Sequence, residues 1–541
     1  MLSGASDYGL RLLPLASSLV ALGLFYHLAK RALVHPAAVC FALTLFALQP
    51  ELIRYAAQVK PYAVDLAVAL ALTLLADFIL SVHQELPRPS LYTRSERHVL
   101  PPLVIPSVSE GPGGRVARNP LTPEVSEASP RPGPSLTLGM TEPRFSRGNG
   151  IGWSLSPSRA LLVGVAGTVA VFLSHAAVLV LAGLAAALLL GFLLAGRRRE
   201  IARLGITIGC WAVSCGAAVW VASREMTPRM HDILWQYWMP TFGPRPHTVI
   251  GDVRWAISTL AGELGDAGLA YPFAPLYLGL AALGAIAHWR RNRSLSLLLL
   301  APIATALAAA DLHLYPFGSR VVLFVVPALM LAVAAGVETL AATLLKLARR
   351  QLPKAGAALL YLVALVPALL AFRADPPVYR IEETKPLLQA VAERRQPGDA
   401  IYVYYGAGHA LRFYGPRYGF QPGDYELGGC HRGDARKYLV EVDGFRGRPR
   451  LWVLIAHAQP RLGEDQLLLA YLDRLGTRRL ALRALPHVRG GGLPAEAFLY
   501  DLTDAKRSTA SAATFPIPPA PSGLDPRLAC AGAANPVPAT P

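Results

Sequence analysis

The feature that most constrains this chain is a series of apolar runs, each about as long as a membrane-spanning helix. Roughly 20 apolar residues suffice to cross the hydrocarbon core of a bilayer. The runs occupy residues 12–29, 36–48, 62–80, 160–173, 176–195, 204–222, 269–289, 294–310, 321–345 and 355–372. With 53% hydrophobic and only 16% charged residues among 541, the composition excludes an ordinary soluble enzyme. The sequence predicts a polytopic α-helical membrane protein with about ten spans.

Basic residues indicate which loops between these runs face the cytoplasm. Lys- and Arg-rich loops are retained on the cytoplasmic side of a membrane. Here they fall in alternate loops, at residues 30–31, 197–203, 290–293 and 346–354. The other loops are then extracytoplasmic, at residues 49–61, 174–175, 223–268 and 311–320 and after residue 372. The formal net charge of +17 is typical of such a protein. No nucleic-acid-binding motif accompanies the charge, so we expect no nucleic-acid partner.

Composition divides the chain into five segments. Residues 1–81 and 159–373 carry the predicted membrane helices. Residues 82–158 are rich in Pro, Ser, Gly and Arg without apolar periodicity, which predicts a disordered cytoplasmic insertion. Residues 374–505 alternate predicted helices with predicted strands, which indicates a small parallel or mixed α/β domain outside the cytoplasm. Residues 506–541 are rich in Ala, Pro and Ser and are predicted to be a disordered tail.

Within the predicted α/β domain, hydrophobic patterning separates helices from strands. The helices are expected at residues 381–394, 407–414 and 463–475, and the strands at residues 400–405, 451–456 and 498–502.

A polar stretch at residues 49–65 separates two apolar runs. Its polar members are Glu51, Arg54, Tyr55, Gln58, Lys60, Tyr62 and Asp65. Charged groups at the border of a span are costly and often mark a site. Pro61 suits the first turn of a new helix and disfavours a helical conformation at Lys60. We therefore predict two helices that meet at a kink lined by polar groups. The alternative is an interfacial loop whose side chains reach back to water.

Three further outer loops carry groups capable of chemistry. Ser174 and His175 interrupt an apolar run, either as a simple polar turn or as hydrogen-bond donors to a ligand. Trp238 lies in the aromatic segment 235–242, which would anchor the chain at the interface or stack on a sugar ring. Arg320 ends the loop that contains His313, on the side where basic residues are not expected. It therefore needs a negatively charged partner. That partner would be a ligand phosphate or, as the alternative, Asp311 in a structural ion pair.

Several of these residues resemble segments of a known family. Pro50, Ile53, Tyr55, Gln58, Lys60, Pro61 and Tyr62, together with residues 172–175 and 312–320, carry the resemblance. The chain resembles the GT-C fold, polyprenyl-phosphate-sugar-dependent membrane glycosyltransferases, and most closely the bacterial relatives of the protein O-mannosyltransferases. The resemblance covers roughly the first 370 residues without the 82–158 insertion.

The resemblance implies an inverting sugar transfer at the outer face of a bacterial inner membrane. The donor would be a polyprenyl-phosphate-linked sugar in the membrane lipid, and the acceptor a glycan, lipid or protein. Residues expected to bind the donor phosphate and sugar are Arg54, Gln58, Lys60, Tyr62, His175, Trp238, His313 and Arg320. No metal ligands are assigned, and a divalent metal requirement stays open. The five cysteines show no metal-site spacing. Cys430 and Cys530 could pair only in an oxidising compartment.

The chain departs from the family pattern at its start. The family carries its acidic catalytic residue in the first outer loop, after a first helix, whereas this chain begins just before what resembles the second helix. We therefore expect the N-terminal helix and the catalytic loop to be missing. Asp7, Glu51 and Asp65 are the candidate substitutes. The alternatives to an enzyme are an inactive relative that binds lipid-linked sugar or a partner, and a transporter of lipid or solute.

Overall fold

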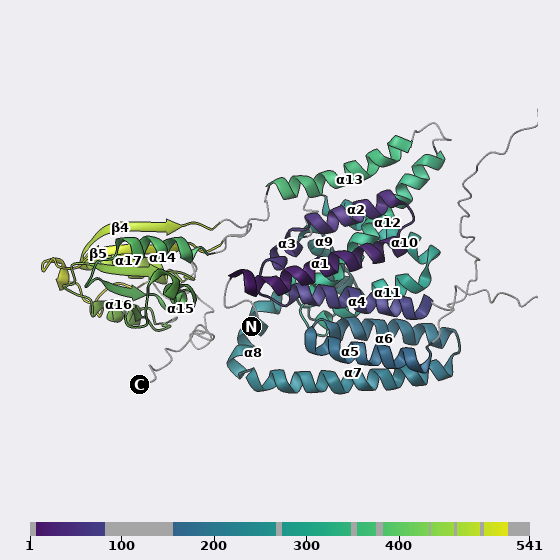
Figure 1. Cartoon of the computed structure of the whole chain (residues 1–541), viewed down its shortest axis with the longest axis horizontal. Coiled ribbons are helices and arrows are strands. Elements are labelled where there is room, and N and C mark those ends of the chain that lie inside the picture. Colours follow the sequence, from purple (N-terminus) through teal and green to yellow (C-terminus); the bar gives the residue numbers. More distant parts are fainter. Residues whose placement is uncertain are drawn as a thin grey trace, which may run out of the picture.

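The computed structural model of the chain describes residues 7–81, 155–266, 273–347, 354–374, 382–431, 434–458, 462–486 and 492–517. A helical bundle forms the N-terminal part, and an α/β region follows it (Figure 1). Most of the predicted insertion, residues 82–154, lies outside the described residues. Its predicted end at residue 158 falls inside a helix that begins at Pro157.

Each apolar run expected from the sequence contains a helix in its described residues. The bundle consists of α1 (Asp7–Ala32), α2 (Pro36–Leu48), α3 (Pro50–Ala56), α4 (Tyr62–Ser81), α5 (Pro157–Leu173), α6 (Ala177–Leu194), α7 (Arg198–Glu225), α8 (Pro228–Trp238), α9 (Val249–Asp266), α10 (Ala274–Arg291), α11 (Arg293–Asp311), the 3₁₀ segment η2 (Ser319–Val325), α12 (Val326–Leu347) and α13 (Lys354–Ala374). The α8 and α9 helices occupy a stretch expected to be a loop.

Six helical segments in the described residues are long and apolar enough to cross a membrane. They are α1, α4, α6, α7, α11 and the continuous segment Ser319–Leu347. The pair α2 and α3, bent by 58°, would add a seventh as one broken span, and α5 and α13 are shorter apolar helices. The chain is therefore a polytopic helical membrane protein, whereas the count of ten crossings stays a prediction.

The predicted kink at residues 49–65 is present. The side chain of Gln49 accepts a hydrogen bond from the backbone amide of Leu52 and so caps the start of α3. The α3 helix ends at Ala56, and α4 begins directly after Pro61. Because proline removes a backbone donor and suits a first helical turn, the chain restarts as a new helix at this point.

The α10 and α12 helices pack at backbone distance. A Cβ atom on Gly284 would lie 1.8 Å from the carbonyl oxygen of Ala332, and one on Gly336 would lie 2.0 Å from that of Leu280. Glycines of this kind allow membrane helices to approach closely, which maximises van der Waals contact where lipid supplies no hydrophobic drive. The glycines therefore determine the spacing of this helix pair.

The α/β region contains a mixed five-stranded sheet in the order β2-β1-β3-β5-β4. Its strands and helices are α14 (Thr384–Arg394), β1 (Ala400–Val403), α15 (Gly408–Tyr414), β2 (Glu426–Leu427), α16 (Arg436–Asp443), β3 (Leu451–Ile455), α17 (Glu464–Leu475), β4 (Thr477–Ala484) and β5 (Ala495–Asp501). The β1 strand is parallel to β2 and β3, and β5 is antiparallel to β3 and β4. The predicted mixed α/β unit is therefore confirmed, although β2, α16 and β4 were not predicted.

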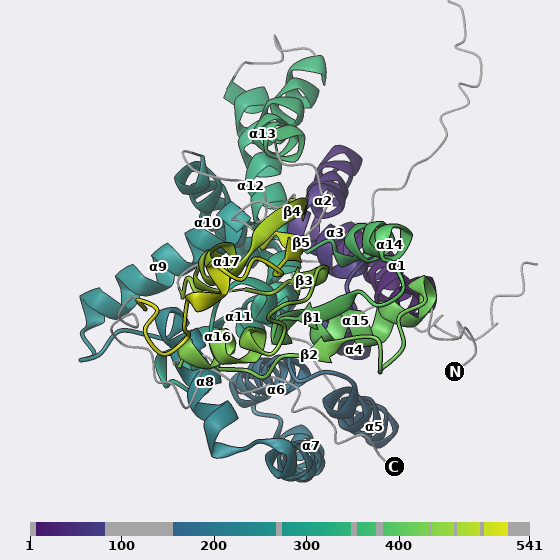
Figure 2. The same cartoon turned by 90° about the vertical axis from the view of Figure 1, so that its left-hand side faces the viewer.

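Helices cover both faces of this sheet (Figure 2). Alternate residues of β1 and β3 point to opposite faces, because side chains in a strand have a period of two. Ile401 and Trp452 pack with α14 and α15 on one face. Tyr402 and Val453 pack with α16 and α17 on the other face. The region therefore has two apolar cores of its own.

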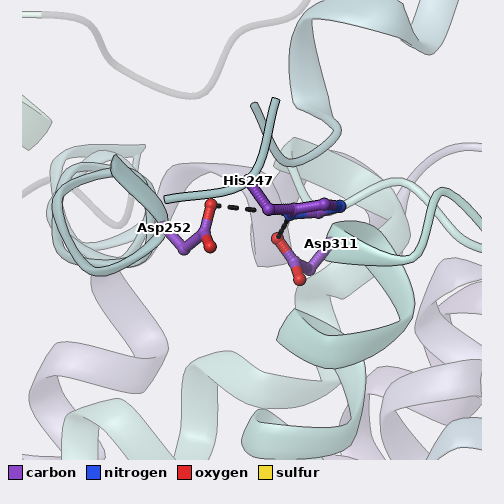
Figure 3. Close-up of side chains that lie close together, drawn as sticks. All are labelled: His247, Asp252 and Asp311. Carbon is purple, nitrogen blue, oxygen red and sulfur yellow. Dashed lines mark ion pairs between the residues drawn. The ribbon is translucent and has the colours of Figure 1, made fainter. Parts of the chain in front are cut away.

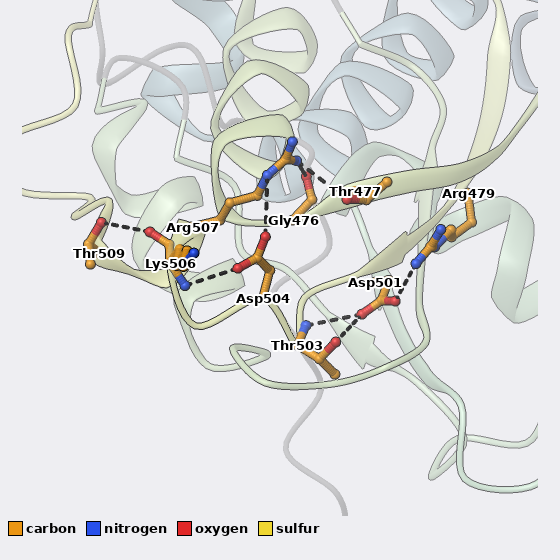
Figure 4. A network of polar contacts seen from close by, with 9 residues as sticks. All are labelled: Gly476, Thr477, Arg479, Asp501, Thr503, Asp504, Lys506, Arg507 and Thr509. Carbon is orange, nitrogen blue, oxygen red and sulfur yellow. Dashed lines mark hydrogen bonds and ion pairs between the residues drawn. The ribbon is translucent and has the colours of Figure 1, made fainter.

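The prediction of a disordered tail is wrong for residues 506–517. Ala512 is buried in the core beside α17, and Phe515 packs edge-on against Tyr471 with ring centroids 5.0 Å apart. Arg507 donates a 2.6 Å hydrogen bond to the carbonyl of Gly476 (Figure 4). These apolar and basic side chains are widely spaced in a Pro- and Ala-rich segment, so they show no periodicity, yet their tertiary contacts order it. Residues 518–541 of the predicted tail lie outside the described residues.

Candidate functional site

Most of the predicted site residues lie at one end of the bundle. The α3 and α8 helices and the start of α1 are at the end that faces the α/β region, which we call the domain-side end (Figure 1). Basic residues mark the opposite ends of α1, α10 and α12, which we call the far end. There Arg291 of α10 hydrogen-bonds the carbonyl of Ala32 at the end of α1. The basic helix ends and most of the predicted site residues therefore lie at opposite ends of the bundle, as the charge pattern predicts.

Aromatic rings surround Arg320 at the domain-side end. Its guanidinium carbon lies 5.4 Å from the ring centroid of Trp238, 5.7 Å from that of Tyr237 and 6.0 Å from that of Tyr62. The Tyr55 hydroxyl is a further hydrogen-bond partner. We call these five residues the Arg320 cluster. Rings within about 6 Å stabilise a cation through their quadrupoles but leave its charge uncompensated.

Within the described part of the chain, Arg320 forms no ion pair with a carboxylate. The expected alternative, a pair with Asp311, does not form, because Asp311 approaches His247 at 3.5 Å. The half-buried guanidinium also has a buried Nε with no hydrogen-bond partner. Its hydrogen bond to the Tyr237 hydroxyl is long, at 3.5 Å. A guanidinium in this state is suited to bind a phosphate, which accepts two parallel hydrogen bonds.

Asp65 is a buried carboxylate near the Arg320 cluster. It is 8% exposed, and its Oδ1 atom has no hydrogen-bond partner. Ser174 and His175 lie beside it, so the predicted turn residues and Asp65 come together. Burial raises the pKa of Tyr315 well above its usual range, and the neighbouring Asp65 and Tyr62 add to the increase. Tyr315 therefore stays neutral, and its hydroxyl donates a 3.0 Å hydrogen bond to the carbonyl of Val321.

Other predicted residues of the kink lie in α3 and in the loop between α3 and α4. Glu51 and Arg54 pair with each other at 3.4 Å, and the Arg54 guanidinium lies 5.6 Å from the Tyr55 ring centroid. The carbonyl of Gln58 accepts a 2.8 Å hydrogen bond from the amide of Lys60, whose side chain is exposed. Arg54 therefore adjoins the Arg320 cluster through Tyr55, whereas the described contacts of Gln58 and Lys60 are local to their loop.

Two predicted site residues have their contacts elsewhere. Asp7 forms ion pairs with Lys385 at 2.8 Å and Arg417 at 3.2 Å, both in the α/β region. His313 donates a 2.9 Å hydrogen bond from Nε2 to the carbonyl of Gly243 and stacks on Phe242 with ring centroids 5.0 Å apart. Asp7 therefore joins the two parts of the molecule, and His313 holds two loops together.

His313 belongs to a seam between residues 239–248 and residues 310–320. The Gly243 amide donates to the Ala310 carbonyl at 3.1 Å, and the Phe317 amide donates to the Thr241 carbonyl at 3.2 Å. One end of this seam carries Trp238 and Arg320. Near the other end, His247, Asp252 and Asp311 come together (Figure 3). Their ligand atoms all lie within 4.8 Å of one another, so in the described residues these three are the group able to hold a metal.

Sequence reasoning missed several members of these groups. Tyr55 was part of the polar stretch but not among the site candidates, although its spacing of seven from Tyr62 is a usable signal. Tyr237 adjoins Trp238 and could have been included with it. Asp252 carried no signal, because its relation to His247 and Asp311 depends on how α9 returns to the bundle.

Comparison with known proteins finds no family model that matches the chain and no curated protein that matches it. The resemblance to GT-C glycosyltransferases therefore stays a prediction.

Proposed function

We propose that the chain binds a polyprenyl-phosphate-linked sugar at its domain-side end and transfers the sugar to an acceptor hydroxyl. The observation that carries this proposal is Arg320, a guanidinium bordered by aromatic rings and lacking a carboxylate partner among the described residues. It lies at the start of an apolar segment, Ser319–Leu347, where a lipid phosphate would reside. Tyr62, Tyr237 and Trp238 offer faces for a sugar ring.

Two observations support an outer-face location for the Arg320 cluster. The far end carries the basic clusters, so the positive-inside rule favours the cytoplasm there and the outer face for the Arg320 cluster. Cys430 of the α/β region is disulfide-bonded. Disulfides persist in oxidising compartments, which supports an extracytoplasmic α/β region. Together these features favour a bacterial inner membrane protein whose site opens outward.

The chemistry assigns separate roles to Arg320 and Asp65. The acceptor oxygen attacks the anomeric carbon, the bond from that carbon to the phosphate oxygen breaks, and the acceptor proton passes to a base. Arg320 stabilises the charge that develops on the departing polyprenyl phosphate. Asp65 is the base we favour over Glu51 and Asp7, because it is buried beside the cluster and forms no ion pair among the described residues. Glu51 pairs with Arg54, and Asp7 pairs with the α/β region.

Binding of polyprenyl phosphate to the full chain in lipid nanodiscs tests the role of Arg320 at the phosphate. We expect Arg320→Ala to weaken binding at least tenfold, since about 1.5–3 kcal/mol is typical of a hydrogen bond to a charged group. Arg320→Lys should recover part of the affinity, because it keeps the charge but not the planar fork. Lys60→Ala, in the loop directly before α4, should also weaken binding.

A matched control is Arg224→Ala, which removes an exposed guanidinium stacked 3.8 Å from the ring centroid of Trp220 in α7. This variant should bind like the wild type.

Transfer of a labelled sugar tests the role of Asp65 as the base. Asp65→Asn should lose transfer and keep binding. Equal binding by the wild type and Arg320→Ala would overturn the proposal. Arg320-dependent binding with no transfer by the wild type would instead favour an inactive lipid-binding relative.

A further inference from the structure

We propose that His247, Asp252 and Asp311 form a binding site for a divalent transition metal, with Zn²⁺ the best match to the ligands. The site joins three segments: the loop before α9, the first turn of α9 and the end of α11. A histidine with two carboxylates is a combination that Zn²⁺ accepts readily, whereas Ca²⁺ and Mg²⁺ prefer oxygen ligands alone. The inference does not depend on glycosyl transfer.

The spacing of the ligand atoms fits a metal better than direct pairing. The Nδ1 atom of His247 lies 3.6 Å from Oδ1 of Asp252 and 3.5 Å from Oδ1 of Asp311. Both distances exceed the usual range of a hydrogen bond. They are close to the separation of two ligands that each lie about 2.1 Å from a tetrahedral zinc ion, which is roughly 3.4 Å. All three ligand atoms lie within 4.8 Å of one another, so small side-chain shifts would bring them around one ion.

The two carboxylate oxygens also lack any other partner. Oδ1 of Asp252 and Oδ1 of Asp311 are both inaccessible to solvent and accept no hydrogen bond. Burying a charged oxygen without a partner is costly. Protonation of His247 cannot satisfy both, because its Nδ1 carries one hydrogen at most. A cation between the three atoms would compensate both oxygens at once.

The backbone around Asp311 is shaped to this arrangement. A Cβ atom on Gly243 would lie 2.6 Å from Oδ1 of Asp311 and 2.8 Å from its Cα. Only glycine lets the two loops approach at this point, and the approach brings Asp311 to the His247 loop. The imidazole is 45% exposed, so a fourth ligand such as water can reach the ion from solvent.

Metal binding here would fix the seam from the end opposite to Arg320. The seam continues from Gly243 through the 3.2 Å hydrogen bond between the Phe317 amide and the Thr241 carbonyl. The ion would therefore hold the α8–α9 loop against the end of α11, as structural zinc sites join segments distant in sequence.

The test uses the full chain, purified in nanodiscs, stripped with a chelator and then titrated with Zn²⁺ alone. We expect about one Zn²⁺ per chain and a rise in Tm on metal addition, since a ligand that binds only the folded state stabilises it. His247→Ala and Asp311→Asn should each lower the affinity at least tenfold and remove the rise in Tm. Co²⁺ in place of Zn²⁺ should give the visible absorption of a low-symmetry site in the wild type only.

His231→Ala is the matched control. His231 lies 3.6 Å from Asp232, a similar distance, but this pair has only one carboxylate and both side chains are more than half exposed. It should bind Zn²⁺ like the wild type. Asp252→Asn preserves the side-chain shape, so it separates loss of a ligand from loss of folding. Equal affinity of the wild type and of folded Asp252→Asn and Asp311→Asn would overturn the proposal, as would a wild type that takes up no stoichiometric Zn²⁺.

Discussion

At the scale of single residues, one buried carboxylate joins three segments at the far end of the bundle. Glu338 of α12 is 5% exposed. Its Oε1 accepts hydrogen bonds from the amides of Val34 at 2.8 Å and His35 at 2.7 Å, and its Oε2 pairs with Arg291 at 3.1 Å. Glu338 therefore accepts the amide hydrogen bonds of the turn between α1 and α2 and also pairs with a cation of α10.

Replacing Glu338 by Gln should destabilise the protein by about 1.5–3 kcal/mol, because the buried side chain loses the negative charge that strengthens its hydrogen bonds to the amides of Val34 and His35 and its pair with the partly exposed Arg291. The measurement is thermal or denaturant unfolding in detergent. Glu200→Gln is the control, since Glu200 pairs with Arg197 at 3.6 Å at a more open position. That change should cost less than about 1 kcal/mol. Similar losses from both variants would show that Glu338 has no special role.

At the scale of elements, the close pair α10 and α12 depends on glycine. Gly336→Ala should destabilise the protein by about 1–3 kcal/mol, because the new methyl group meets the Leu280 carbonyl. Gly279→Ala, in the same helix pair, has open space around it and should be neutral or slightly stabilising. Unfolding of the two variants under identical conditions makes the comparison. Equal tolerance of both would mean that α10 and α12 separate without cost.

At the scale of the whole molecule, Asp7 forms the ion pairs that link the bundle to the α/β region among the described residues. Its pairs with Lys385 and Arg417 lie near the start of α1. The hydrogen bond that Lys385 donates to Asp7 raises the pKa of Lys385, so while Asp7 is ionised this pair is fully formed below the usual lysine pKa and is lost as the pH rises through the raised value. At neutral pH the contact should respond to salt, since both partners are partly exposed.

A carbodiimide cross-link between the Asp7 carboxylate and the Lys385 ammonium, 2.8 Å apart, tests this contact. We expect the linked peptide at low salt and a lower yield at high salt. Arg417→Ala should also lower the yield by removing the second cation from Asp7. Asp434 and Lys437, 3.4 Å apart within α/β residues close in sequence, provide an internal standard. Absence of the Asp7 product at low salt, with the standard present, would contradict the observed docking.

Much of the fold could be predicted because its signals are local. Apolar runs predicted the bundle helices, Ser174 and His175 predicted the break between α5 and α6, and Pro61 predicted the start of α4. The α8 and α9 helices and the ordered residues 506–517 were missed, because amphipathic or irregular segments gain order only from what they pack against.

The candidate site was also predictable only in part. Residue type and position alone singled out Tyr62, Trp238 and Arg320, since a cation and aromatic rings at the end of a span are unusual. Which of them meet was decided by the tertiary structure. Asp311 approaches His247 and not Arg320, and Asp7 meets the α/β region. These pairings join residues far apart in sequence, so no local pattern contains them.

The sequence by itself determined that this chain is a polytopic helical membrane protein. In lipid every backbone polar group must be satisfied inside the segment that carries it, so an apolar run of sufficient length has to be a helix. Only the tertiary structure decided that Arg320 lies among aromatic rings without a carboxylate partner in the described residues, and that His247, Asp252 and Asp311 converge. The reason is that side-chain pairing depends on how whole helices pack, through contacts such as Gly336 with Leu280, and not on the run in which a residue sits.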